Sequence, residues 1–250
     1  MSKSHSARVD RLSENSWRLD IPAGSKYRYR LAQLDDHGTH QRSLFHWKPP
    51  LSFSLQARVS AEALPGTWGF GLWNDPFNFA ISYNLLMPRL PALPDAAWFF
   101  YAAPENHLSV YDDLPSNRFL AATFSSKKIP TALLVLSSPI MALTLVPGAA
   151  QAVRRLLRRW VKQDAVHVQA CQTDWHAYRI EWEPQQVAFF VDDVELKRTN
   201  TAPHPPLSLV IWIDNQYAAL PPTGRLRYGY SGNPDPAWME IKDIRLHASD

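Results

Sequence analysis

The chain has 250 residues, of which 46% are hydrophobic and 20% are charged, so it can bury a sizeable core and is not a wholly disordered protein. Its 26 basic and 23 acidic residues leave a net charge of +3, which is weak support for a nucleic-acid partner, and we expect none. The chain has 21 prolines and 9 glycines, a balance that favours rigid loops between strands over flexible linkers.

The single cysteine, Cys171, excludes an intramolecular disulfide and a cysteine-based zinc cluster. The polar N-terminal residues contain no apolar segment of the kind that signal peptides carry. Together these features predict a cytoplasmic location, with peripheral membrane contact as an open alternative. We expect residues 1–15 to be disordered or frayed and residues 16–250 to form one domain.

Short runs in which apolar and polar residues alternate recur along the chain and predict β-strands. The clearest run is 51–60, where five apolar side chains alternate with polar ones, as in a half-buried strand. In the run 67–73, Gly69 and Gly71 would let a neighbouring group approach the backbone. Further strands are predicted near 17–21, 26–31, 97–101, 119–125, 178–182, 187–191, 194–197, 207–214 and 239–246. Many short strands separated by turn residues indicate a β-sandwich.

One segment departs from the strand pattern. Residues 129–153 contain no charged side chain, but three prolines interrupt them, which favours buried or interfacial helices over a membrane span. Residues 151–163 then predict an amphipathic helix. Its apolar positions are Val153, Leu156, Leu157, Trp160 and Val161, and its basic positions are Arg154, Arg155, Arg158, Arg159 and Lys162. We therefore expect a helical insertion at about 129–163.

Several segments of the C-terminal half carry a recognisable pattern. They are Trp175-His-Ala-Tyr-Arg-Ile-Glu-Trp-Glu-Pro184, Val187-Ala-Phe-Phe-Val-Asp-Asp193, the run 207–214 and the closing segment 238–247. In these segments the chain resembles concanavalin A-like jelly rolls, specifically the laminarinase-type (family 16) glycoside hydrolases. Residues 51–60 and 66–73 are similar to the early strands of that family. The resemblance implies an all-β concanavalin A-like β-sandwich (jelly roll) whose concave face binds the ligand.

The chain departs from that family at the catalytic strand. The hydrolases that it resembles carry a Glu-x-Asp-x-x-Glu strand, in which one carboxylate attacks the anomeric carbon and another protonates the leaving oxygen. Here the strand that follows 67–73 is Ala97-Trp-Phe-Phe-Tyr101, and the Glu-x-Asp-x-x-Glu pattern occurs nowhere in the chain. We therefore do not expect hydrolysis of the family 16 type, and we assign no catalytic residue.

Aromatic side chains on the predicted strands are candidates for a stacking platform, and polar residues beside them could orient a ligand. The candidate ligand-binding residues are Trp73, Asn74, Asp75, Trp98, Tyr101, Trp212, Asp214 and Asn215. The alternatives are that the aromatic residues belong to the core and that the polar ones are ordinary turn residues. We expect no metal or other cofactor, and no dedicated set of ligands supports a structural Ca²⁺.

Three functional hypotheses follow. The first is a non-catalytic β-sandwich that binds a carbohydrate, or another ring-bearing small molecule, on an aromatic concave face. The second is a non-hydrolytic enzyme of the cyclase or isomerase type that acts on a hydrophobic small molecule, with Asp75, Asp214, Glu105 and His107 as the available acids and bases. The third is a membrane-associated structural protein. Its candidate membrane contacts are Arg154, Arg155, Arg158, Arg159 and Trp160.

Overall fold

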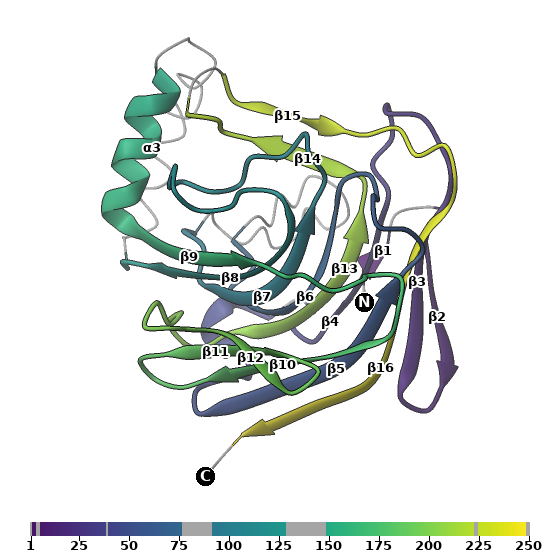
Figure 1. The fold of residues 1–250 in the computed structure, drawn as a ribbon, viewed down its shortest axis with the longest axis horizontal. Helices are drawn as coiled ribbons and strands as arrows, with labels where there is room; N and C mark the ends of the chain where they lie inside the picture. Colours follow the sequence, from purple (N-terminus) through teal and green to yellow (C-terminus); the bar gives the residue numbers. More distant parts are fainter. Residues whose placement is uncertain are drawn as a thin grey trace.

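Two β-sheets packed face to face form the body of the protein (Figure 1). The computed structural model describes residues 2–3, 6–38, 40–76, 92–128, 149–222 and 225–248. Each of the two sheets has seven strands in the described residues, and the strand pairs within them are antiparallel. The protein is therefore an all-β jelly-roll sandwich, as the sequence predicts.

The strands of each sheet come from distant parts of the chain. In spatial order, the first sheet contains β1 (Ser2–Lys3), β4 (Leu31–Asp35), β13 (Ser208–Asp214), β6 (Thr67–Trp73), β7 (Ala96–Ala102), β8 (Arg118–Ser126) and β9 (Val161–His167). The second contains β12 (Val194–Thr199), β11 (Val187–Val191), β10 (His176–Trp182), β5 (Leu51–Val59), β16 (Ala237–Ala248), β3 (Ser16–Ile21) and β2 (Arg8–Ser13). The other described elements are the hairpin of β14 (Gln216–Ala219) and β15 (Arg227–Tyr230), the 3-10 helix η1 (Arg42–Leu44) and helix α3 (Ala149–Trp160).

The main core lies between the two sheets, where the inward-facing residues of both sheets meet. Along β5 every second side chain is buried, as the alternation of its sequence predicts. The central strand β13 is buried at six of its seven positions, because apolar groups cover both of its faces. The large aromatic side chains that are fully buried are Trp68, Trp182, Phe53, Phe70, Phe99, Phe119 and Phe189.

The turns and the irregular strand also follow the sequence. Asp192 and Asp193 both have positive φ (49° and 63°) and join β11 to β12 in a two-residue hairpin. The slip in alternation near Lys242 and Asp243 corresponds to a bulge, since the register between β16 and β5 shifts between Lys242 and Arg245. The sequence indicates both features, because two adjacent aspartates are typical of a tight turn and the apolar alternation along 239–246 slips at Lys242 and Asp243.

Two predictions near the N-terminus are wrong. Residues 8–13 lie in the segment predicted to be frayed, yet they form β2 and pair with β3. The side chains of β2 are almost all exposed, so backbone hydrogen bonds hold the strand and its sequence shows no apolar alternation. The strand predicted at 26–31 is also misplaced, because residues 26–28 lie in a turn and bend, and β4 spans Leu31–Asp35.

The helical insertion ends earlier than predicted. Helix α3 stops at Trp160, and residues 161–163 begin β9, which pairs with β8 through Val161 and Ser126. Residues 129–148, the first part of the predicted insertion, lie outside the described residues. Within the described part of the chain, no helix combines the length and apolar character that crossing a membrane requires.

Gly66 lies where two strand ends approach closely, and we predict that it cannot be replaced without loss of stability. Its φ is +76°, and an added Cβ would lie 2.3 Å from the carbonyl oxygen of Asp214. Gly66→Ala should therefore lower the free energy of unfolding by about 2–4 kcal/mol through backbone strain and overpacking together. Chemical denaturation measures the loss. Gly38→Ala is the matched control, because its φ is also positive (+45°) but no described atom lies within 4 Å of the added carbon. Equal losses would contradict the prediction.

Candidate functional site

The side of the first sheet that points away from the main core carries a second cluster of apolar side chains. Alternate residues of β6, β7, β8 and β13 point to this side, because successive side chains of a strand face opposite ways. The sheet curves around it, so we call it the concave face (Figure 1). Five residues form what we call the aromatic face: Trp73, Trp98, Phe100, Phe124 and Trp212.

The rings of the aromatic face form a continuous layer. The ring centroid of Trp212 lies 5.6 Å from that of Trp98 and 5.8 Å from that of Phe100. Trp73 stacks on Trp212 at 6.3 Å with an interplanar angle of 6°. Gly69 makes room for this layer, since a Cβ there would lie 2.8 Å from the Trp212 ring. The structure thus confirms the prediction that this glycine admits a close neighbour.

The aromatic face is enclosed. Trp98 is 6% exposed and Trp212 is 8% exposed, whereas Trp73 is half-buried. Leu93 and Leu108 pack against the cluster, and the hairpin of β14 and β15 lies on the same side of the sheet (Figure 1). Trp73, Trp98 and Trp212 therefore belong to neither a shallow open platform nor the main core.

Two hydrogen-bond donors of the aromatic face have no acceptor in the described residues. They are the buried indole N–H groups of Trp73 and Trp98. The indole N–H of Trp212, in contrast, donates to the Thr67 hydroxyl at 3.0 Å. Because an unpaired buried donor is costly, the N–H groups of Trp73 and Trp98 can stabilise an acceptor atom that a ligand brings to this face.

No carboxylate points to the concave face from β6, β7, β8 or β9, all of which are fully described. The concave positions of β7 are Ala96, Trp98, Phe100 and Ala102, and their partners on β8 are Phe124, Ala122, Leu120 and Arg118. A retaining glycosidase needs two carboxyl groups about 5–5.5 Å apart across the scissile bond. The centre of this face does not supply them.

Asp214 and Asn215, at the end of β13, hold the fold together. Oδ1 of Asp214 accepts hydrogen bonds from the backbone N–H of Thr67 (3.2 Å), the Thr67 hydroxyl (2.8 Å) and the N–H of Gln216 (3.1 Å). Asn215 is fully buried; its amide accepts from the N–H of Arg30 and donates to the carbonyls of Arg28 and Ser231. These contacts contradict the prediction that Asn215 binds a ligand, because they already use both amide hydrogens.

Burial raises the pKa of Asp214 to about 7, although its hydrogen bonds oppose that shift. The unfolded chain releases this proton near pH 4, so the folded protein holds it more tightly between about pH 4 and 7. We predict that the free energy of unfolding falls as the pH rises through this window and then levels off. Asp214→Asn should flatten that dependence in urea denaturation series, whereas Asp10→Asn, an exposed change on β2, should not. Identical pH slopes for the wild type and Asp214→Asn would contradict the prediction.

Tyr101 does not lie on the aromatic face. It is three residues from Trp98 on the same strand, so it points into the main core, where it stacks on Trp68 at 5.6 Å. Phe100 and Phe124 take part in the aromatic face but are absent from the predicted set. The period of two along β7 identifies Phe100 from Trp98, whereas Phe124 depends on the register between β7 and β8.

Asn74 and Asp75 follow β6 at one end of the aromatic face. The Asn74 amide donates to the Leu93 carbonyl at 2.8 Å and accepts from the Asp95 N–H at 3.1 Å, so it serves the turn. A carboxylate oxygen of Asp75 lies 4.0 Å from Nε2 of His37, whose ring centroid is 6.4 Å from that of Trp73. Asp75 thus stays a candidate for orienting a ligand at this end.

The acids and bases that the enzyme hypothesis names lie in different environments. Nδ1 of His107 lies 3.1 Å from the Ser116 hydroxyl, and burial, followed by the charge of Arg154, lowers the pKa of His107. Glu105 is exposed, and Asp214 is held by Thr67 as described above. No group of three or more His, Cys, Asp or Glu residues in the described ranges has an arrangement that could hold a metal ion.

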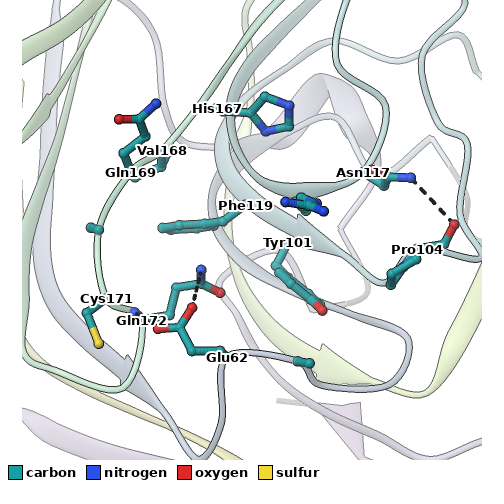
Figure 2. A pocket seen from close by; sticks show the side chains of 13 residues that line it. Glu62, Tyr101, Pro104, Asn117, Phe119, His167, Val168, Gln169, Cys171 and Gln172 are labelled. Atoms are coloured by element: carbon teal, nitrogen blue, oxygen red, sulfur yellow. Dashed lines mark hydrogen bonds between the residues drawn. The ribbon is translucent and has the colours of Figure 1, made fainter.

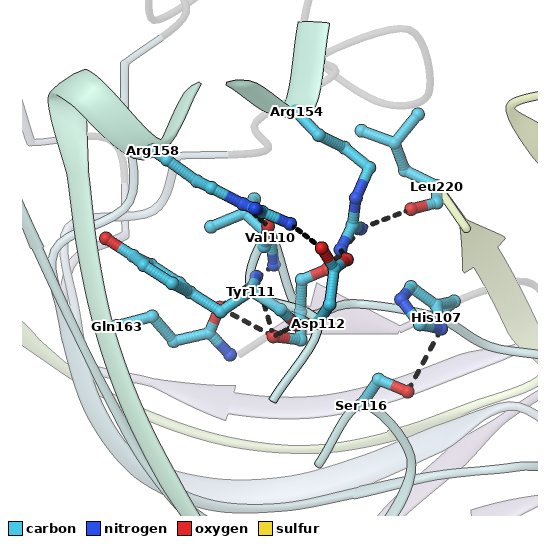
Figure 3. A network of polar contacts seen from close by, with 10 residues as sticks. His107, Val110, Tyr111, Asp112, Ser116, Arg154, Arg158, Gln163 and Leu220 are labelled. Atoms are coloured by element: carbon cyan, nitrogen blue, oxygen red, sulfur yellow. Dashed lines mark hydrogen bonds and ion pairs between the residues drawn. The ribbon is translucent and has the colours of Figure 1, made fainter. Parts of the chain in front are cut away.

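Helix α3 docks on the sandwich through two arginines, as Figure 3 shows. Arg154 is 2% exposed and donates to the carbonyls of Ser109 and Leu220 and to Asp112, each at 2.6 Å. Arg158 also bonds to Asp112, and these two contacts hold the pKa of that carboxyl below its ordinary value. The predicted basic face of the helix is therefore split, with these two arginines turned inward.

The outward side of α3 carries both charge and apolar surface. Arg155 and Arg159 are exposed, as are Leu156 (46%) and Trp160 (38%). Leu156 and Trp160 thus lie on the solvent side, although the sequence pattern assigns them to a buried apolar face. The helix differs from the prediction because Arg154 and Arg158 point toward the sandwich. The spacing of residues along the sequence does not indicate this orientation.

A pocket of about 810 Å³ opens at the ends of β7, β8 and β9, and we call it the strand-end pocket (Figure 2). Its lining includes Tyr101 and Phe119 with polar groups around them. The lining residues are Glu62, Ala63, Tyr101, Pro104, Asn117, Arg118, Phe119, His167, Val168, Gln169, Ala170, Cys171 and Gln172. Apart from Tyr101, the sequence analysis predicts none of these residues for a site.

The family model described as glycosyl hydrolases family 16 matches residues 151–211, about a quarter of the chain. The match contains β10, whose sequence carries the resemblance described above, and it does not include β7. No curated protein matches the chain. The chain therefore resembles family 16 glycoside hydrolases over a segment that contains no predicted catalytic strand.

Solved structures of similar architecture span nearly the whole chain at low identity. A glycoside hydrolase family protein from Mycobacterium thermorestibile is 13% identical, with 93% of this chain and 76% of that chain covered and a TM-score of 0.45. A legume lectin-like domain from Entamoeba histolytica is 10% identical, with 98% and 88% covered and a TM-score of 0.47. A family 16 endo-glucanase from Bacteroides ovatus is 8% identical, with 97% and 85% covered and a TM-score of 0.48.

Proposed function

We propose that this protein is a non-hydrolytic binding β-sandwich that takes a carbohydrate, or a ligand with comparable rings, on its aromatic face. The observation that carries the proposal is the composition of β7. This strand places Trp98 and Phe100 at the centre of the concave face. The family 16 hydrolases that the chain resembles carry their catalytic carboxylates on the corresponding strand.

The chemistry of the aromatic face suits a ring-bearing ligand. Flat aromatic rings pack against the C–H faces of sugars, and buried aromatic surface supplies most of the binding energy in such sites. The unpaired N–H groups of Trp73 and Trp98 can donate to ligand oxygens and fix the orientation of the ring. Asp75 and His37, at the edge near Trp73, add polar groups at one end.

We predict that Trp98→Ala weakens glycan binding by about 10-fold or more, because a central ring and its donor are lost. Saturation-transfer NMR with gluco-oligosaccharides and with an aromatic glycoside measures the binding. Trp98→Phe keeps a ring but removes the N–H, so an intermediate loss is expected. Trp238→Ala is the matched control, since Trp238 lies on the other sheet under Arg18.

The same preparations should release no reducing sugar from the oligosaccharides that they bind. Hydrolysis by the wild-type protein would overturn the non-hydrolytic part of the proposal. Unchanged binding after Trp98→Ala, with the variant shown to be folded by its near-UV circular dichroism, would remove the aromatic face as the binding surface.

A second candidate function, peripheral contact with an anionic membrane, is favoured by the outward side of α3. Leu156 and Trp160 are exposed there, four residues apart, beside the exposed Arg155 and Arg159. Exposed apolar side chains flanked by arginines suit the interface of a bilayer that contains acidic lipids. Lys127 extends this charge, since its ammonium lies 5.9 Å from the Trp160 ring.

We predict that replacing Arg155 and Arg159 by glutamine weakens binding to phosphatidylserine-containing vesicles by about 30-fold, because each arginine contributes about 1 kcal/mol. Vesicle sedimentation measures the bound fraction, and phosphatidylcholine vesicles give the neutral reference. The control replaces Arg8 and Arg11 of β2, on the opposite side of the molecule from α3 (Figure 1). If both double variants bind alike, the helix is not the contact.

A further inference from the structure

We propose that the strand-end pocket is a second binding site, for an acidic sugar: a hydroxylated ring that carries one carboxylate, with Arg118 as the partner of that carboxylate. The proposal goes beyond the function assigned to the aromatic face, because it uses other residues and a different kind of contact. It depends on charge and hydrogen bonding at the ends of β7, β8 and β9, where the aromatic layer has ended.

Arg118 lines the pocket as an exposed cation that forms no ion pair with the residues that the structure describes. Its guanidinium makes no hydrogen bond or ion pair with the described parts of the chain, in contrast to the paired Arg154 and Arg158. A guanidinium presents a planar fork of donors that matches the two oxygens of a carboxylate. Arg118 is thus ready to form a bidentate contact with an anionic ligand.

The backbone at Arg118 is strained. Its φ is +66°, a left-handed conformation that is unfavourable for a residue with a Cβ. The surrounding structure holds it, because Arg118 pairs with Ala102 of β7 and the next residue, Phe119, accepts a hydrogen bond from the N–H of Val168. Strain of this kind concentrates at ligand sites, where it directs a side chain that the site needs.

Other polar groups of the pocket lining suit ligand hydroxyls. The Glu62 carboxylate is fixed by the backbone N–H of Gln172 (2.9 Å) and by its side-chain amide (3.3 Å), as Figure 2 shows. Gln172 is 9% exposed, and its amide oxygen has no donor in the described residues. A ligand hydroxyl that donates to this oxygen would satisfy a buried acceptor that the chain leaves open.

The size and charge of the pocket select among anions. A volume of about 810 Å³ lies within the range of small-molecule sites and accommodates a sugar ring with its hydration. The negative charge of Glu62, which also lines the pocket, favours a singly charged carboxylate over a doubly charged phosphate. Tyr101 and Phe119, which are almost fully buried in the main core, form the apolar floor of the pocket.

The single cysteine of the chain makes the site directly testable. Cys171 is exposed, lines the pocket and is the one thiol that a reagent can modify. We expect glucuronate to slow the alkylation of Cys171 by neutral iodoacetamide in a saturable way, measured by intact-protein mass spectrometry. Glucose, which lacks the carboxylate, and glucose 6-phosphate, which is doubly charged, should protect at least 10-fold less effectively.

Two variants at Arg118 separate binding from folding. Arg118→Gln should raise the glucuronate concentration needed for half-maximal protection by about 10-fold or more, because the charge-assisted bonds are lost. Arg118→Gly should lose protection equally while unfolding at a higher temperature, since glycine relieves the strained backbone. Arg198→Gln is the matched control; this arginine pairs with Glu195 on β12, outside the pocket. Trp98→Phe should keep the protection, so a failure of the aromatic face leaves this test intact.

The proposal is overturned if glucuronate does not slow the alkylation of the wild-type protein, or if it protects Arg118→Gln as well as the wild type. Equal or better protection by glucose 6-phosphate would show a general anion site and would also overturn the assignment to a carboxylate. Loss of protection in Trp98→Phe would show that the ligand occupies the aromatic face instead.

Discussion

The alternation of side chains along β7 is the constraint on which both the core and the candidate site depend. Phe99 and Tyr101 point into the main core, whereas Trp98 and Phe100 point to the concave face. Because one strand supplies both layers, the register that closes the sandwich also sets the positions of the rings on its outer side. The aromatic face is therefore as precisely placed as the core itself.

A chain of hydrogen bonds anchors the same arrangement at the end of β13. The indole of Trp212 donates to the Thr67 hydroxyl, and that hydroxyl donates to Asp214. Tyr29 donates to the other oxygen of Asp214 at 3.3 Å. One ring of the aromatic face is thus tied through a buried carboxyl to the connection between β13 and β6, so the state of that carboxyl bears on the position of the ring.

Sequence reasoning predicts the strands that bury a regular face and misses those that do not. The strict alternation along 51–60 predicts β5 nearly to its ends, whereas β2 is mostly exposed and only its Val9 packs against the main core. The hairpin at Asp192 and Asp193 is local, so the sequence suffices to predict it.

The candidate site depends more on contacts between residues that are far apart in the sequence. The sequence therefore predicts only some of its residues. The rings of Trp73, Trp98 and Trp212 lie together on one face, but Tyr101 does not join them, because its position along β7 points it to the other face. The side-chain amide of Asn215 is already hydrogen-bonded to residues about 185 positions away in the chain. The burial of Arg154 depends on a loop more than 40 positions away. Neither pairing leaves a periodic signal in the sequence.

The edges of the two sheets have a further consequence for the behaviour of the protein at high concentration. β1, at one edge of the first sheet, has only two residues, and β9, at the other, carries Lys162 and Asp164. In the second sheet, β2 and β12 are lined with charged side chains. Unpaired edges of this kind resist the addition of a strand from another molecule, which protects the sandwich from fibril-like growth.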